Sequence, residues 1–342
     1  MPNRDLVVVG ASAGGVEALR DLVRDLPADL PAAVLVVLHL PSAAFSALPA
    51  ILGRAGKLPS FQAEDGMPLR KGAIYVAPPD HHLLVRGETM ALGRGPKENG
   101  HRPAIDVLFR SAARWHGAQT VGVILSGSLD DGAAGLLSIV EHGGAAVVQD
   151  PESALYDGMP FAALQAVPQA LQAAGVHLAQ LVVRLCEESP SDDPARVDPE
   201  IRMETDIAEL DEEALSAGDR PGVPAAMTCP DCNGAMFRIE EGNLVRFRCR
   251  VGHAWSPETL LAEQFELAET ALWAAIRTME EKRALHRDLA QRAGATGHSE
   301  RSRNYHLERA AEAEATAAVL RDLLRRALAG GGGLAAEEEA SG

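Results

Sequence analysis

Aromatic residues and long apolar runs are both scarce in this sequence of 342 residues. Phe, Tyr and Trp together make up 4% of the chain, and no uninterrupted apolar run approaches the roughly 20 residues that a membrane-spanning helix needs. The N-terminus has neither the basic start nor the apolar segment of a secretory signal peptide. These absences exclude direct membrane insertion, and we expect a cytoplasmic protein.

Positive charge and cysteine are also in short supply. The chain has 32 Lys and Arg against 48 Asp and Glu, a formal net charge of -16, so no nucleic-acid partner is expected. Of the four cysteines, Cys229, Cys232 and Cys249 lie in one short region, whereas Cys186 stands alone. This spacing favours metal binding in a reducing compartment over a disulfide framework.

The first half of the chain alternates short apolar runs with helical patterns. The run at residues 6–9 is β-branched and apolar, and a helical stripe follows it from Val16 until Pro27. Further strands are expected at residues 33–38, 73–76, 121–125 and 145–148, with helices at 42–52, 104–115 and 133–141. The alternation predicts an α/β fold with a doubly wound, mostly parallel sheet.

Small residues surround Ser12, where the first strand gives way to the first helix. Residues 10–14 read Gly-Ala-Ser-Ala-Gly and fit the Gly-x-Ser-x-Gly pattern of an exposed nucleophilic serine. A helix N-terminus suits either an oxyanion or a phosphate, so a nucleotide loop and a purely structural turn stay open. The nucleotide reading fits less well, because Gly-x-Gly-x-x-Gly needs glycine at Ser12.

Three expected strands end at residues that carry acid-base chemistry. Ser12 follows the first strand, His39 the second, and Asp130 and Asp131 follow the strand at 121–125. The carboxyl ends of parallel strands meet at one edge of a sheet, so a Ser/His/Asp constellation is expected there. Each residue also has a plain structural interpretation: the aspartates can cap the next helix, and other histidines compete with His39, namely His81, His82 and His101.

A series of ordered motifs adds to this interpretation. In chain order they are Gly-Ala-Ser-Ala-Gly-Gly at 10–15, His-Leu-Pro at 39–41, Tyr-Val-Ala-Pro at 75–78, His-Arg-Pro at 101–103, Asp-Gly-Ala at 131–133 and Gly-Met-Pro at 158–160. With these motifs the sequence resembles the catalytic domain of the CheB-type chemotaxis protein-glutamate methylesterases. The resemblance covers most of residues 4–185.

The resemblance implies a fold, a site and a reaction. The catalytic residues would be Ser12, His39 and Asp131, and catalysis would need no cofactor. The reaction would be hydrolysis of glutamyl 5-methyl esters on methyl-accepting chemoreceptor-like proteins to glutamate and methanol, with glutamine deamidation as a second activity. Such a protein would act in opposition to a receptor methyltransferase.

Two features depart from the family's pattern. The family usually has Thr-Gly-Met-Gly before its Asp-Gly, whereas this chain has Ser-Gly-Ser-Leu at residues 126–129 followed by two aspartates. We choose Asp131 over Asp130 because Gly132 follows it directly. Leu129 in place of glycine can alter the path of the loop, whereas Ser128 can still offer its backbone N–H to the oxyanion. The family's receiver domain is also missing before the first strand, so control by phosphorylation in cis is not expected.

A second cluster of chemistry-bearing residues lies further along the chain. Cys229 and Cys232 are separated by two residues, and Cys249 is followed by His253. Three thiolates and an imidazole form a tetrahedral zinc set with no open position for catalysis, so we expect structural zinc in a zinc-ribbon-like module. Similar ribbons recur as C-terminal extensions of receiver-less methylesterases. On this basis chelation should unfold the ribbon without stopping hydrolysis.

The expected organisation follows from these segments. It comprises a catalytic domain at 1–186, an acidic linker at 187–224, the zinc-ribbon-like module at 225–256, a helical hairpin at 257–329 and a disordered tail at 330–342. Two other functions stay open: an esterase or amidase with another protein substrate, and a catalytically inactive regulatory binding protein of the same fold. Ser12 and His39 argue against the inactive protein, whereas Leu129 argues for it.

Overall fold

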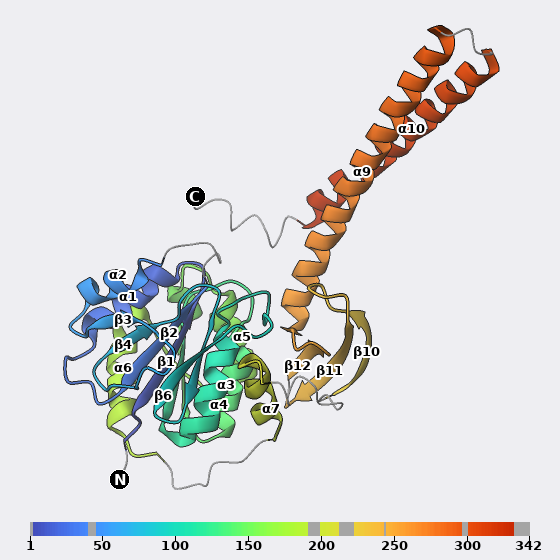
Figure 1. Ribbon diagram of the computed structural model, residues 1–342. Coiled ribbons are helices and arrows are strands. Elements are labelled where there is room, and N and C mark those ends of the chain that lie inside the picture. The colour runs from blue at the N-terminus through green and yellow to red at the C-terminus, as the bar shows by residue number, and fades with distance from the viewer. Residues whose placement is uncertain are drawn as a thin grey trace. The chain divides into compact units, whose positions relative to one another are not determined.

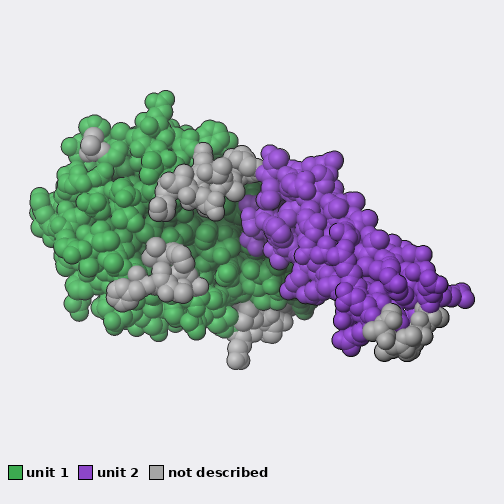
Figure 2. Space-filling model, turned by 90° about the horizontal axis from the view of Figure 1, so that it is seen from above, with its two compact units in different colours: residues 1–260 green, residues 261–342 purple. Residues whose placement is uncertain are grey.

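The computed structural model describes residues 3–39, 46–190, 199–211, 222–242, 244–295 and 300–331. The chain forms two compact units, residues 1–260 and residues 261–342, which Figure 2 shows in different colours. The first unit holds every residue singled out above for catalysis or for metal binding.

A seven-stranded parallel sheet forms the centre of the first unit (Figure 1). Its strand order is β3-β4-β2-β1-β7-β8-β9, and every neighbouring pair is parallel. The strands are β1 (Leu6–Ala11), β2 (Ala33–Leu38), β3 (Ser60–Gln62), β4 (Ile74–Val76), β7 (Thr120–Ile124), β8 (Ala145–Gln149) and β9 (Leu171–Ala173). The expected α/β fold with a mostly parallel sheet is therefore confirmed.

Helices cover both faces of this sheet, because alternate side chains of the apolar strands point to opposite faces. Leu6 and Val8 pack with α3 (Ile105–His116), α4 (Ala133–Glu141) and α5 (Gly158–Ala166). Val7 and Val9 pack on the other face with α1 (Gly15–Asp25), α2 (Leu48–Ala55) and α6 (Gly175–Glu187). The sheet is thus doubly wound, with one apolar core on each side. Two short 3-10 helices complete this part, η1 (Gly117–Gln119) and η2 (Pro151–Ser153).

Two elements beside α3 have no clear signal in the sequence. An antiparallel hairpin forms from β5 (His82–Arg86) and β6 (Thr89–Gly93). Helix α7 (Pro199–Ala208) lies within the segment expected to be an acidic linker, yet Ala208 is buried with Leu84 and Val107. Residues 212–221 of the expected linker lie outside the described residues, as do residues 40–45, which include the start of the expected helix 42–52.

A small antiparallel sheet follows α7 and completes the first unit. Its four strands are β10 (Val223–Thr228), β11 (Ala235–Glu241), β12 (Leu244–Cys249) and β13 (Ala254–Trp255). Its core is small and contains Met236, Phe247 and Trp255 together with Cys229 and Cys249. We call residues 223–255 the ribbon.

The second unit consists of two long helices. They are α9 (Pro257–Ala295), whose first turn belongs to the first unit, and α10 (Glu300–Gly331). Ion pairs of Arg287 with Glu314 and of Arg321 with Glu280 show that the helices run antiparallel, as a helical hairpin does. Residues 332–342 of the expected tail lie outside the described residues. In the described part of the chain, every helix is too short or too polar to cross a bilayer.

Candidate active site and metal centre

The turn from β1 into α1 places Ser12 at the carboxyl edge of the sheet. Gly14 caps α1 with φ 67, a left-handed conformation that glycine adopts without strain. A Cβ atom at Gly14 would also lie only 2.8 Å from Ser126 Oγ, so the turn has no room for a larger residue. The backbone N–H of Ser12 donates to the carbonyl of Ser126 at 3.0 Å, which ties this turn to the end of β7.

The structure brings Ser12, His39 and Asp131 together. His39 follows β2, and its Nδ1 lies 3.2 Å from Ser12 Oγ. Its other ring nitrogen, Nε2, lies 2.8 Å from Asp131 Oδ2. When Nε2 carries the ring proton and donates a hydrogen bond to Asp131, Nδ1 is free to accept the proton of Ser12. This arrangement can activate a serine hydroxyl as a nucleophile.

Asp131 is buried and surrounded by donors. Oδ2 accepts the backbone N–H of Ile105 at 2.7 Å, and Oδ1 accepts Asn99 Nδ2 at 3.0 Å and the backbone N–H of Asp106 at 3.3 Å. Burial opposes ionisation, but the hydrogen bond and charge of His39 and these backbone donors hold the pKa of Asp131 well below its usual range. Asp131 is therefore a carboxylate that can orient His39. Sequence reasoning missed Asn99.

The neighbouring aspartate has a different environment. Asp130 Oδ1 accepts a hydrogen bond from Ser256 Oγ at 2.7 Å, and burial raises the pKa of Asp130 to about 8. Asp130 thus bonds Ser256, whereas Asp131 bonds the His39 ring directly. Near neutral pH Asp131 is thus ionised and Asp130 is protonated and neutral, and of the two only Asp131 bonds His39 and can orient its ring.

The competing histidines lie elsewhere or act differently. His81 Nδ1 bonds the Pro79 carbonyl, and buried His82 lies between the Pro96 carbonyl and the N–H of Ala104. His101 stacks on His39 with ring centroids 3.6 Å apart and an interplanar angle of 14°. Burial, and then the charge of His39, lowers the pKa of His101 to about 3, so its ring stays neutral. Among these rings, His39 is the one placed between Ser12 and Asp131.

The loop after β7 borders Ser12. A Cβ atom at Gly127 would lie 2.9 Å from Ser12 Cβ and 2.1 Å from Met159 Sδ, so this position accepts only glycine without rearrangement. Leu129 adopts φ 60, the left-handed conformation that a glycine at this position would adopt freely. The leucine that departs from the family's pattern therefore follows a glycine-like backbone path.

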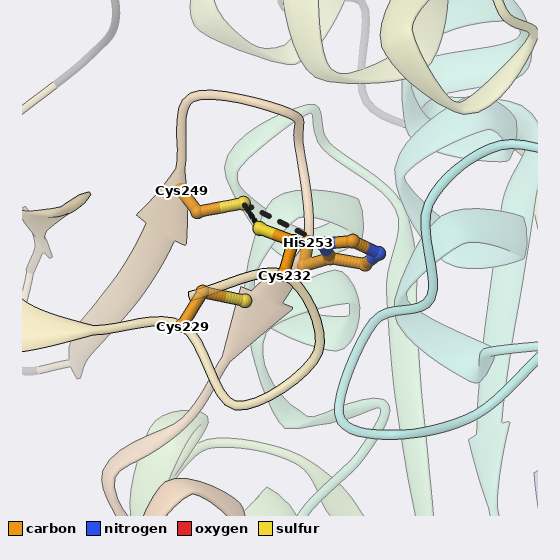
Figure 3. A group of neighbouring side chains, drawn as sticks. All are labelled: Cys229, Cys232, Cys249 and His253. Carbon is orange, nitrogen blue, oxygen red and sulfur yellow. Dashed lines mark hydrogen bonds between the residues drawn. The ribbon is translucent and has the colours of Figure 1, made fainter. Parts of the chain in front are cut away.

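The four expected metal ligands lie in one cluster (Figure 3). Their ligand atoms all lie within 4.8 Å of one another, with Cys249 Sγ 3.6 Å from both Cys232 Sγ and His253 Nδ1. A tetrahedral zinc ion with Zn–S bonds of about 2.3 Å separates its sulfur ligands by about 3.8 Å, so the spacing fits zinc. Asp231 Oδ2 lies 3.8 Å from the other nitrogen of His253, a common arrangement beside a metal-bound histidine.

Comparisons with known proteins agree on the family. The family model for CheB methylesterase matches residues 7–181. The Xanthomonas oryzae protein-glutamate methylesterase/protein-glutamine glutaminase 2 is 43% identical over 162 residues, which are 46% of this chain and 45% of that protein. A Leptospira interrogans relative provisionally given the same activities is 35% identical over 184 residues, 54% of this chain and 95% of its own length.

A solved structure agrees with the fold. The Thermotoga maritima CheB methylesterase catalytic domain is 28% identical, with a TM-score of 0.52, and the match covers 54% of this chain and 99% of that one. The resemblance inferred from the ordered motifs is thereby confirmed. The chain therefore belongs to the CheB methylesterase family and is a carboxylic ester hydrolase.

Proposed function

We propose that this protein hydrolyses glutamyl 5-O-methyl esters on methyl-accepting chemoreceptor-like proteins, releasing glutamate and methanol. The observation that carries the proposal is the hydrogen-bonded line from Ser12 Oγ through His39 to Asp131. The names of the relatives support methyl esters of protein glutamate as the substrate, and their glutaminase name supports glutamine deamidation as a second reaction. The chemoreceptor-like proteins follow from the family to which the chain belongs.

The mechanism follows from this line of contacts. His39 Nδ1 takes the proton of Ser12 as Oγ attacks the ester carbonyl, and Asp131 stabilises the imidazolium that forms. We assign the stabilisation of the developing oxyanion to the backbone N–H of Ser128, because the N–H groups of Ser126 and Gly127 in the same loop already donate to Gln149 Oε1 and to the carbonyl of Tyr156. His39 then gives its proton to the departing methoxide, leaving an acyl ester on Ser12. Water, deprotonated by His39, hydrolyses that ester to glutamate.

The inactive binding protein receives less support than the enzyme. Leu129 was the feature that favoured the inactive protein, because leucine in place of glycine can move the loop away from the nucleophile. Leu129 instead keeps a left-handed backbone, and Gly127 lies against Ser12. We propose that the enzyme works in the cytoplasm in opposition to a receptor methyltransferase, because continued hydrolysis requires a reaction that restores the esters.

We also propose that Cys229, Cys232, Cys249 and His253 bind a structural zinc ion. All four ligands of a tetrahedral site come from the protein, so the ion has no open position for substrate. When bound, zinc supplies folding free energy to a ribbon whose own core is small.

The test of the esterase is methanol release from a methyl-esterified receptor fragment. Ser12→Ala should reduce the rate by about a thousandfold or more, because the nucleophile is lost. Ser138→Ala is the matched control: Ser138 Oγ bonds the carbonyl of Ala134 within its own helix α4, so this variant should keep the wild-type rate. Equal rates in Ser12→Ala and wild type would contradict the proposal.

A further inference from the structure

A short loop, Lys97–His101, lies between the ribbon and the catalytic residues. The backbone N–H of Asn99 donates to the carbonyl of Ala254 in β13 at 2.8 Å, and the N–H of Ala254 donates to the carbonyl of Lys97 at 3.3 Å. These two bonds form a short parallel ladder between Glu98 and Ala254. The ribbon therefore fixes the backbone of this loop.

The side chain of Asn99 continues the connection into the active site. Its Oδ1 accepts hydrogen bonds from the backbone N–H of Ser256 at 2.9 Å and from Thr259 Oγ1 at 3.2 Å. Its Nδ2 donates to Asp131 Oδ1 at 3.0 Å. Asn99, Ser256, Thr259 and Asp131 are all buried, so water does not compete for these bonds. One amide group thus joins the start of α9, which follows the ribbon directly, to the catalytic carboxylate.

The same loop also contacts the catalytic base. His101, two residues after Asn99, stacks its neutral ring on His39. Its backbone N–H donates to the carbonyl of Glu98 at 2.9 Å, which closes the loop on itself. A displacement of the loop would therefore disturb both Asp131 and His39.

A buried ion cluster holds the ribbon in one position against the rest of the first unit. Arg248 of β12 lies 3.0 Å from Glu98 of the loop and 3.1 Å from Glu204 of α7. Arg110 of α3 pairs with the same two carboxylates, and Arg246 of β12 lies 3.1 Å from Glu204. The side chains of these five residues are at most 7% exposed. Loss of the ribbon would leave Glu98 and Glu204 with Arg110 as their shared cation, one positive charge against two buried negative charges, so docking and loop position are coupled.

We propose that the metal-bound ribbon positions the catalytic residues through the loop Lys97–His101, with Asn99 as the positioning residue for Asp131. The catalytic part of this inference rests on the proposed esterase function. It replaces the expectation from the sequence that chelation would leave hydrolysis intact. Here the ribbon is part of the support of the active site, and loss of the metal lowers turnover without changing a catalytic residue.

The first test needs no substrate. Backbone hydrogen exchange is measured on the full chain before and after removal of the metal with EDTA. Peptides covering residues 97–106 should lose protection together with the ribbon, whereas peptides of β1 and β2 should keep theirs. Restoring zinc should restore protection. Unchanged exchange at 97–106 in a chain whose ribbon has lost its protection would overturn the proposal.

The second test separates positioning from binding. Arg248→Met and Asn99→Ala should lower kcat for methanol release about tenfold or more with KM unchanged, because the reacting groups lose their alignment while the substrate surface remains. The matched control is Arg238→Met on the same ribbon, since Arg238 is exposed and pairs with exposed Glu240. Wild-type kcat in both Arg248→Met and Asn99→Ala would overturn the inference. A wild-type chain without methanol release would instead count against the esterase proposal, and the exchange test would still stand.

Discussion

Asp130 and Asp131 are neighbours in the chain, yet their surroundings drive their charge states apart. Asp131 receives His39 and two backbone N–H groups, which hold its pKa well below the usual range despite burial. Burial raises the pKa of Asp130 to about 8, against one strong donor, Ser256. One carboxylate thus stays ionised to orient a base, and the other stays protonated near neutral pH.

Asp131→Asn should abolish most of the activity. The amide can still contact His39, but it can donate to the ring nitrogen and so favour the tautomer in which Nδ1 no longer accepts the proton of Ser12. We expect kcat to fall by about a thousandfold or more, as in other triads, with little change in KM. Steady-state methanol release measures both. Asp130→Asn is the control and should stay within a few fold of wild type; equal losses in the two variants would contradict the assignment of Asp131.

Asp130→Asn should also change how stability depends on pH. Folded Asp130 keeps its proton up to about pH 8, whereas the unfolded chain releases it near its ordinary value of about 3.9. Between these values the native state binds more protons, so the contribution of Asp130 to stability is present at low pH and is lost as pH rises. The variant lacks this loss. Urea unfolding of both proteins at about pH 5 and about pH 8 measures this difference. Relative to wild type, the free energy of unfolding of Asp130→Asn should rise with pH, by up to about 1.4 kcal/mol per pH unit. Equal changes with pH in the two proteins would refute the raised pKa.

At the scale of elements, we expect the ribbon to depend on the proposed zinc ion more than on its core. Two turns carry the ligands, one between Cys229 and Cys232 and one between Cys249 and His253, and a few apolar side chains lie between them. So small a core is not expected to offset the entropy of ordering the four strands, and the proposed zinc ion would make up the difference.

Cys249→Ser should remove that metal. Wild-type protein should contain about one zinc ion per chain by elemental analysis, and the variant much less, since a hydroxyl is a poor replacement for a thiolate ligand. Buried Trp255 lies in the ribbon core, so its fluorescence should shift to longer wavelength in the variant. Val251→Ser, an exposed change in the same turn, should keep the zinc. Full zinc content in Cys249→Ser would rule out this ligand set.

The long buried strands could be predicted from the sequence because each is a local run of apolar, β-branched residues. The three strand-end residues could be predicted because they follow these runs. Helix α7 had no such signal: its acidic character suggested solvent, whereas Glu204 is buried against Arg110, Arg246 and Arg248, which lie far away in sequence. The role of Asn99 was hidden for the same reason. Its partners Asp131 and Ser256 are 32 and 157 residues away, and a short-range pattern cannot reveal such contacts.

At the scale of the molecule, the parallel sheet explains how distant residues form one site. Strand β1 lies between β2 and β7, and Ser12, His39 and Asp131 follow the carboxyl ends of β1, β2 and β7 respectively. The family match ends at residue 181, whereas α7 and the ribbon lie beyond it, and the ribbon bonds the loop Lys97–His101 through Ala254 and Arg248. The family's catalytic fold thus acquires part of its support from a segment outside the family match.

The central claim is that Ser12 is the nucleophile of an ester hydrolase. The most direct measurement is acid quenching of a single turnover on a methyl-esterified receptor fragment, followed by mass spectrometry of the digested protein. The account predicts a covalent ester between Ser12 and a receptor glutamate that forms as methanol appears and then decays, and that is absent from Ser12→Ala. Methanol release by Ser12→Ala at the wild-type rate, with no such ester in either protein, would contradict it.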